Sequence, residues 1–412
     1  MSEDIAPPHD IDATVFVRAV ARLHEWFEVQ APGRNRIPSM EGLRGFSIML
    51  VFLVHYSLAV APWANPDSVT FQILRAMAGL GNAGVDLFFL ISGFLIYGVL
   101  VRKSQPFGKY ISRRVRRIYP VFLVVMAIYI VLSTIAPSES KLPSHLPAAL
   151  LLVVQSILLL PGIVQMQPIV GVAWSLSYEM FFYLCLPLLL SVVALRRRSR
   201  TTRVVFFIGL IGVIIANAVA FGGVHVRLIM FVAGILLHET IQVFPESAAS
   251  GWVDAAAVLV VVLSFIVVWL LREHRTPRGL LLAPEGANPV SEIYEAIVLF
   301  IGFFALCCAS FARDGWVSRV FSVKPVRWIG NISYSYYLIH NLVLHVMFAG
   351  IKLIDPPLAR AEAFVWIMLP LSFAVTLVPA ALLFLLVERR YSLATKRTSE
   401  PARADRVSPQ IA

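Results

Sequence analysis

The sequence predicts an all-α fold, a polytopic integral membrane bundle of about ten transmembrane helices with one shorter helix that does not span. Three observations predict it. Hydrophobic residues make up 58% of the 412 residues and charged residues only 14%, whereas a soluble domain has about 25% charged residues. Apolar runs long enough to cross a bilayer recur along the chain. Basic residues gather in the short segments between these runs, which is typical of membrane proteins.

Ten apolar runs are each long enough for a helix to cross about 30 Å of hydrocarbon at about 1.5 Å per residue. A further run at 147–163 is shorter and ends in Pro161-Gly162, so we expect a re-entrant or surface helix there. The spanning runs lie at 44–61, 81–100, 119–136, 174–195, 204–221, 226–244, 252–271, 292–312, 331–354 and 363–387.

The positive charges set the orientation. When 147–163 does not span, the basic clusters at 102–117, 196–203, 313–327 and 389–397 fall on one side, which the positive-inside bias assigns to the cytoplasm. Both termini are then cytoplasmic. Outer loops are expected at 62–80, 137–173, 222–225, 272–290 and 355–362, and the charges of 272–290 leave the count open by one helix.

Composition divides the chain into a cytoplasmic N-terminal segment at 1–36, a membrane domain at 37–392 and a disordered cytoplasmic tail at 393–412. No apolar run of the signal-peptide kind precedes residue 37, and Val15 to Val29 are expected to form a short surface helix. The net charge of +11 lies in the clusters between apolar runs, so it indicates topology and not nucleic-acid binding. Three cysteines fall in apolar segments, and no spacing of ligands predicts a metal site.

Arg44 and His55 form the most informative pair of polar residues in the first run. Eleven helical steps of about 100° bring them to within roughly 20° of one face, about 16 Å apart along the axis. An ionisable side chain inside a membrane costs about 2.5 kcal/mol or more, and such residues are functional by default. The alternative is a structural histidine that is hydrogen-bonded to a neighbouring helix.

Polar residues also occur in the second and fourth runs. Asp86 lies in the outer third of the second run, where it requires a donor. Gly84 and Gly93 allow close approach of either another helix or a ligand. Glu179 lies about 7 Å into the fourth run, at a depth similar to that of His55, so we expect the two to meet in one cavity. The alternative for Glu179 is a side chain that snorkels to water beside interfacial aromatic residues.

Four arginines, Arg113, Arg114, Arg116 and Arg117, precede the third spanning run. Guanidinium groups suit phosphate oxygens, so the cluster is a candidate cytoplasmic phosphate clamp. A topology signal or contact with anionic lipid remains the alternative. In the ninth run Tyr337 and His340 share a helix face, and a core histidine satisfied by a neighbouring hydroxyl is the alternative to a site residue.

Six stretches of the chain combine these polar residues with glycines and aromatic residues. They are Glu41-Gly42-Leu43-Arg44-Gly45 with His55, Gly84-Val85-Asp86-Leu87-Phe88-Phe89 through Ser92-Gly93-Phe94, Arg116-Arg117-Ile118-Tyr119-Pro120, Trp174-Ser175-Leu176-Ser177-Tyr178-Glu179, Ile332-Ser333-Tyr334-Ser335-Tyr336-Tyr337-Leu338 with His340, and Val387-Glu388-Arg389. In this order they resemble the motifs of acyltransferase family 3, integral membrane enzymes that acylate cell-surface carbohydrates and, in some members, antibiotics or lipids. The resemblance covers roughly 37–392. Glu41 stands where aspartate is commoner, and Arg390 where proline is frequent.

The resemblance implies an O-acyltransferase of the bacterial inner membrane. Its donor substrate is acetyl-CoA or another acyl-CoA from the cytoplasm, with no permanently bound cofactor, and its acceptor is a hydroxyl of a cell-surface carbohydrate or lipid-linked sugar. His55 serves as general base, a task that suits an imidazole at neutral pH. The expected catalytic residues are His55, Arg44, Glu179 and Asp86, with Glu179 or Asp86 either orienting the imidazole or binding sugar hydroxyls. The expected donor-binding residues are Arg113, Arg114, Arg116, Arg117, Ser92, Tyr337 and His340.

Two other classes of function compete with this interpretation. A transporter or flippase of a lipid-linked glycan or small solute also uses a bundle with a few buried charges, but the sequence shows no pair of corresponding halves. A membrane scaffold or sensor does not require Arg44 and His55 on one face. Because the chain ends soon after the last run, we expect the membrane unit to complete the transfer without an added extracytoplasmic domain.

Overall fold

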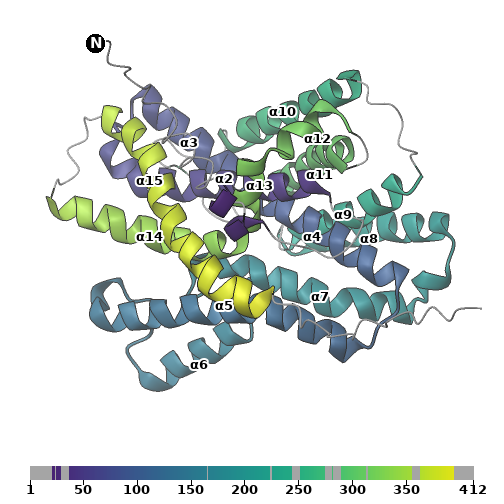
Figure 1. The fold of residues 1–412 in the computed structure, drawn as a ribbon, viewed down its shortest axis with the longest axis horizontal. Helices are drawn as coiled ribbons and strands as arrows, with labels where there is room; N and C mark the ends of the chain where they lie inside the picture. Colours follow the sequence, from purple (N-terminus) through teal and green to yellow (C-terminus); the bar gives the residue numbers. More distant parts are fainter. Residues whose placement is uncertain are drawn as a thin grey trace, which may run out of the picture.

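In a computed structural model the chain is described at residues 21–23, 25–28, 37–164, 166–222, 225–243, 251–273, 281, 289–311, 314–354 and 362–393. These residues form helices and no β-strand, with the chain folded into one layered bundle (Figure 1). The α-helices are α2 (Pro38–Val60), α3 (Val69–Gly81), α4 (Ala83–Arg102), α5 (Phe107–Ile135), α6 (Leu146–Ile157), α7 (Trp174–Val192), α8 (Arg200–Ala220), α9 (Ile229–Ile241), α10 (Gly251–Glu273), α11 (Pro289–Phe311), α12 (Trp316–Phe321), α13 (Lys324–Asn331), α14 (Ser333–Ile354) and α15 (Glu362–Leu383).

Short helices of other types join or extend these elements. One-turn 3₁₀-helices occur at Ala61–Trp63, Pro137–Glu139, Gly171–Ala173, Leu195–Arg197 and Val226–Leu228, and α15 continues as a π-helix at Phe384–Ser392.

The described residues contain nine helices that are long and apolar enough to cross a membrane. The predicted all-α membrane fold is therefore confirmed, with one long helix fewer than expected. The difference lies in the run at 226–244, where α9 has only 13 residues and a length of about 20 Å. This helix starts late because a 3₁₀ turn at Val226–Leu228 precedes it and places Arg227 beside Asp86 of α4.

The prediction of an outer loop at 62–80 is wrong over most of its length. Ser68 caps α3 by accepting a hydrogen bond from the Phe71 amide at 3.2 Å, and only Asn82 separates α3 from α4. Together they form an apolar segment of 34 residues, Val69–Arg102, in which Asp86 lies in the first turn of α4. Arg75 of α3, which lowers the hydropathy there, forms an ion pair of 3.0 Å with Glu273 of α10.

The short helix expected near 147–163 is α6, which has 12 residues and leaves Leu150, Leu151 and Val154 exposed at the edge of the bundle. The chain then turns sharply at Leu159, which has a φ of 54°. The expected surface helix at 15–29 is described only at 21–23 and 25–28, where Phe27 stacks on Phe384 with 6.2 Å between ring centroids. The remainder of 1–36 and residues 394–412 lie outside the described residues.

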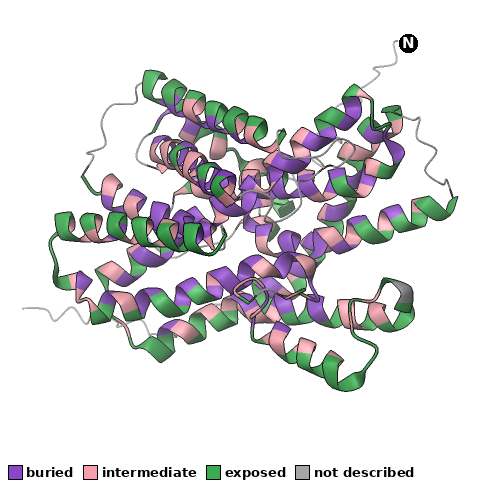
Figure 2. Cartoon of the chain, turned by 180° about the vertical axis from the view of Figure 1, so that it is seen from behind, coloured by how far each residue is buried: buried purple, intermediate pink, exposed green. Residues whose placement is uncertain are grey.

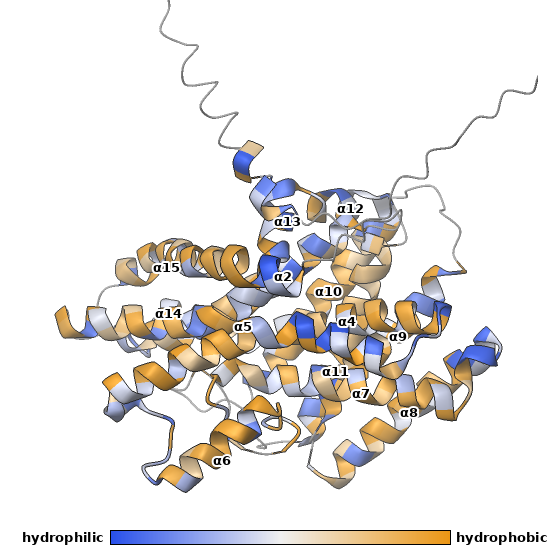
Figure 3. Ribbon diagram, turned by 60° about the horizontal axis from the view of Figure 1, so that its bottom comes forward, coloured by the Kyte–Doolittle hydropathy of each residue, from blue (hydrophilic) through white to orange (hydrophobic). Residues whose placement is uncertain are grey.

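Helix α2 lies at the centre of the bundle and contacts α3, α4, α12, α13 and α14. Its residues are largely buried, and Figure 2 shows exposed residues mainly on the outer helices. Apolar residues dominate those outer helices, as expected for surfaces that face lipid, whereas polar residues gather near α12, α13 and the start of α2 (Figure 3). Arg44, which lies near the start of α2, is therefore near a polar end of the molecule.

The two glycines of the second predicted run serve helix packing. A Cβ at Gly84 would overlap the Ser47 carbonyl of α2, and a Cβ at Gly93 would overlap the Phe231 carbonyl of α9. Gly234 makes the reciprocal close approach from α9 to Leu90. These contacts decide between the two interpretations of Gly84 and Gly93 in favour of close helix packing.

Candidate active site

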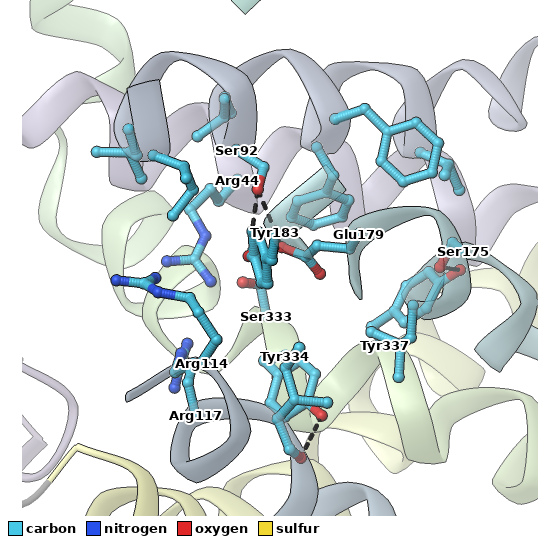
Figure 4. A pocket seen from close by; sticks show the side chains of 18 of the residues that line it. Arg44, Ser92, Arg114, Arg117, Ser175, Glu179, Tyr183, Ser333, Tyr334 and Tyr337 are labelled. Atoms are coloured by element: carbon cyan, nitrogen blue, oxygen red, sulfur yellow. Dashed lines mark hydrogen bonds between the residues drawn. The ribbon is translucent and has the colours of Figure 1, made fainter. Parts of the chain in front are cut away.

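A cavity of about 340 Å³ lies among α2, α4, α5, α7 and α14 (Figure 4). This volume is within the roughly 300–1,000 Å³ typical of small-molecule sites. Helix α4 provides an apolar wall, and the other helices contribute most of the polar groups. The lining residues are Arg44, Val85, Phe88, Phe89, Ile91, Ser92, Leu95, Ile96, Val99, Arg114, Arg117, Ile118, Ser175, Leu176, Glu179, Tyr183, Ser333, Tyr334 and Tyr337.

Three guanidinium groups gather on one side of this cavity, those of Arg44, Arg114 and Arg117 (Figure 4). Arg44 forms no hydrogen bond or ion pair with any residue that the structure describes. Arg114 lies 5.6 Å from the ring centroids of both Tyr110 and Tyr183 and has no carboxylate partner within the described part of the chain. Two positive charges without paired carboxylates make this end of the cavity favourable for an anion.

Arg113 and Arg116, which the sequence grouped with these arginines, are exposed on the other side of α5. Arg113 donates a hydrogen bond of 2.9 Å to Gln105. Arg114 and Arg117 are three apart and share the helix face that borders the cavity. The structure therefore brings two of the four clustered arginines to the cavity, and Arg44 completes the set.

Arg117 is held by a carboxylate that the sequence showed only as part of a charged helix end. Glu388 has a fully buried side chain and lies 2.5 Å from Arg117, and its other oxygen accepts a hydrogen bond of 2.5 Å from the Ser335 hydroxyl. Glu388 belongs to the π-helix, a rare element that is frequent at functional sites. The acidic residue in an arginine-rich helix end was the only signal for this pairing.

Replacing Arg117 by methionine is expected to destabilise the protein by about 3–5 kcal/mol, because the Glu388 carboxylate would remain buried without its partner. The measurement is the thermal unfolding midpoint of the detergent-solubilised protein. The double variant Arg117→Met with Glu388→Leu is the control and is expected to recover most of the loss. A double variant as unstable as the single one would contradict this role of the pair.

Glu179 lies in the middle of the cavity, between the arginines and Tyr337 (Figure 4). Its Oε1 accepts hydrogen bonds from the Ser92 hydroxyl at 3.0 Å and from the Tyr183 hydroxyl. At the far end, the hydroxyls of Ser175 and Tyr337 are 2.7 Å apart. The structure brings the predicted residues Ser92, Glu179 and Tyr337 to one cavity. The sequence analysis did not include Tyr183, whose spacing of four from Glu179 on one helix was the available signal.

His55 does not line the cavity and forms no hydrogen bond with Glu179 in the described structure. Its Nδ1 lies 2.9 Å from the Val51 carbonyl and 3.2 Å from Nε2 of His340. His340 in turn lies beside the cavity-lining Tyr337, with 6.2 Å between ring centroids. His55 therefore lies outside the lining, beyond Tyr337 and opposite the arginines. Its side chain is partly exposed, and its side-chain polar contact is a second histidine.

Asp86 forms no hydrogen bond with His55 in the described part of the chain. Its carboxylate accepts hydrogen bonds of 3.2 and 3.3 Å from Arg227, whose guanidinium lies 5.6 Å from the Trp174 ring centroid. Burial lowers the pKa of His225, and the Nδ1 atom of His225 forms a hydrogen bond of 2.8 Å with the Tyr178 hydroxyl. This network joins α4, α7 and the turn before α9, and neither it nor Glu179 provides the carboxylate expected to orient His55.

Among the described residues, no group of three or more histidine, cysteine, aspartate or glutamate side chains could hold a metal ion. The three cysteines, Cys185, Cys307 and Cys308, are free. The polar groups of the cavity are thus guanidinium, carboxylate and hydroxyl groups, a set suited to an anionic organic ligand.

A family model for an acyltransferase domain matches residues 37–386, most of the chain. The chain belongs to acyltransferase family 3. The resemblance stated from its motifs is thereby confirmed, and the enzyme class of the family agrees with a cavity that has guanidinium groups at one end and two contacting histidines beyond the other.

Known relatives show what kinds of protein the chain is similar to. The peptidoglycan O-acetyltransferase OatA of Listeria monocytogenes is 24% identical over 377 residues, 82% of this chain and 55% of that protein. The exopolysaccharide production protein ExoZ of Rhizobium meliloti is 32% identical over 25% of this chain and 32% of its own length. The acyltransferase MdmB of Streptomyces mycarofaciens is 34% identical over 37% of this chain and 39% of that protein. The chain spans about half the length of the OatA relatives, and no solved structure matches it.

Proposed function

We propose that this protein is a membrane O-acyltransferase that moves an acyl group, most simply acetyl, from cytoplasmic acyl-CoA to a hydroxyl of a cell-surface carbohydrate or lipid-linked sugar. The observation that carries the proposal is the cavity with unpaired guanidinium groups at one end and the contacting pair His55 and His340 beyond the other, in a chain of this family. The OatA relatives, named as O-acetyltransferases, support acetyl as the group. Family membership favours an enzyme over a transporter.

In this proposal Arg44 and Arg114 bind phosphates of the donor at the polar end of the cavity, with Arg117 beside them. The cavity holds a pantetheine arm but not a whole CoA molecule, so the nucleotide remains toward the cytoplasm. The arm runs along the apolar wall of α4 toward Tyr337. Arg44 and His55 are separated by about 16 Å on α2, a distance that suits the length of the arm.

At the Tyr337 end His55 acts as general base. It takes the proton of the acceptor hydroxyl while that oxygen attacks the thioester carbonyl carbon. The new C–O bond forms, the C–S bond breaks, and CoA leaves as a thiolate that receives the proton from His55. The products are an acyl ester and free CoA, and no acyl-enzyme is required. Ser92, Glu179 and Tyr183 line the path and hydrogen-bond polar groups of the arm or the acceptor.

We further propose that the protein resides in a bacterial inner membrane with both termini in the cytoplasm, in agreement with its basic clusters. The test is a comparison of surface glycans by mass spectrometry in cells with and without the gene. Loss of a mass that equals one acyl group from a glycan, restored by the wild-type gene, is expected. Unchanged masses of every glycan and lipid would contradict the proposal.

A further inference from the structure

His340 is the side chain that contacts the ring of His55. The two imidazoles are edge to face, with 4.8 Å between their centroids and an interplanar angle of 85°, and His340 Nε2 lies 3.2 Å from His55 Nδ1. The His340 side chain is completely buried. A hydrogen bond between two imidazoles requires one nitrogen to donate and the other to accept, so the protons on both rings can be assigned from their surroundings.

The proton on His340 is fixed by the backbone. Its Nδ1 lies 3.0 Å from the Tyr336 carbonyl oxygen and 2.9 Å from the Tyr337 carbonyl oxygen. Carbonyl oxygens only accept hydrogen bonds, so Nδ1 carries the proton. A neutral imidazole has a single N–H, and therefore Nε2 of His340 presents a lone pair to His55.

The proton on His55 follows from that lone pair. Nδ1 of His55 faces two acceptors, Nε2 of His340 and the carbonyl oxygen of Val51. The Val51 carbonyl oxygen also accepts the helical hydrogen bond from the backbone N–H of His55, so the ring and the backbone of His55 share this acceptor. Nδ1 therefore carries the proton, and Nε2 of His55 has the lone pair that a base requires.

We infer that His340 is a positioning residue, which holds His55 in the tautomer with its proton on Nδ1 and thereby makes Nε2 the basic atom. The inference rests on the proposed role of His55 as general base and names the group that orients it. When His55 takes up a proton, its Nδ1–H donates a charge-assisted hydrogen bond to His340, which stabilises the imidazolium.

The surroundings of His340 keep its ring in place. The Tyr336 ring stacks on it, with 5.2 Å between centroids and an interplanar angle of 11°, and the Tyr336 hydroxyl is 2.8 Å from the Thr376 hydroxyl. The Nδ1–H of His340 faces backbone carbonyl oxygens, which accept its hydrogen bond but are not basic enough to remove its proton. His340 thus positions His55 and does not pass a proton onward.

The test is ¹⁵N NMR of the full-length protein in nanodiscs, labelled with ¹⁵N-histidine, with the His55 signals assigned by their loss in His55→Ala. The ring-nitrogen shifts distinguish the two neutral tautomers. The wild type is expected to show Nδ1–H at His55. His340→Leu, which removes the acceptor, is expected to give a mixture of tautomers, and His340→Gln, whose Oε1 replaces the acceptor, is expected to restore Nδ1–H.

Kinetics provide a second measurement, the transfer of labelled acetyl from acetyl-CoA to glycan in membrane vesicles from the host cell. His340→Leu is expected to lower kcat by about 10- to 100-fold with an unchanged KM for acetyl-CoA, and His340→Gln to recover most of it. His345→Leu, a variant of an exposed histidine on the same helix, is the matched control.

The outcomes separate this inference from the function on which it rests. A wild-type His55 with its proton on Nε2 overturns the inference without any variant, as does a folded His340→Leu protein with unchanged His55 signals. Full acetyl transfer by His55→Ala would instead overturn the general-base role, while the tautomer measurement would still report on the contact with His340.

Discussion

His55→Ala is expected to reduce acyl transfer by about 10²- to 10⁴-fold, the contribution typical of a general base. The variant removes the nitrogen that takes the proton of the acceptor hydroxyl. Attack on the thioester would then depend on a neutral hydroxyl with water as its base. The measurement is the acyl content of the surface glycans, or the transfer of labelled acetyl in membrane vesicles.

The structure also predicts what this variant leaves intact. The arginine end of the cavity lies about 16 Å away along α2, so acetyl-CoA binding to the solubilised protein is expected to be unchanged. The loss should therefore fall on kcat and not on donor affinity, the signature of an interaction made in the transition state. The wild-type level of acyl transfer is expected for the control His345→Ala, which removes an exposed histidine of α14. Normal acylation of the glycan by His55→Ala would rule out the base assignment.

Much of this fold was predictable because membrane helices follow local rules. Length and hydropathy identified the spanning runs, and helical periodicity placed Arg44 and His55 on one face of α2. The helix within 62–80 was not predicted because Arg75 lowers the hydropathy of that segment. The Arg75 charge is stabilised by an ion pair with Glu273, about two hundred residues later in the chain. Local hydropathy contains no information about such a partner.

The site illustrates the same limit. Four residues predicted from the sequence line one cavity, Arg44, Arg117, Ser92 and Glu179. The prediction of a carboxylate neighbour for His55 rested on depth alone. Depth fixes the position of a residue along the membrane normal and leaves its direction around the helix axis open. The side chain of His55 points toward α14, where its Nδ1 lies 3.2 Å from His340 Nε2, and only the packing of α2 against α14 determines that contact.

The variants Arg44→Gln and Arg114→Gln are each expected to weaken acetyl-CoA binding by about 10- to 150-fold. Each removes a guanidinium that has no carboxylate partner among the described residues and is therefore available to phosphate. Hydrogen bonds to charged groups contribute about 1.5–3 kcal/mol, which corresponds to this range of Kd. The measurement is a titration of the detergent-solubilised protein with acetyl-CoA.

Arg113→Gln and Arg116→Gln are the matched controls, because both residues are exposed on the same helix as Arg114. They remove the same charge from the same end of α5, so a long-range electrostatic effect would weaken binding in all of these variants and would fade with added salt. Direct ligation predicts a loss for Arg114→Gln and little change for the controls. Equal losses at Arg113 and Arg114 would instead support a clamp of four arginines, as the sequence predicted, and would mean that the donor binds across the outer surface of α5 and not within the cavity.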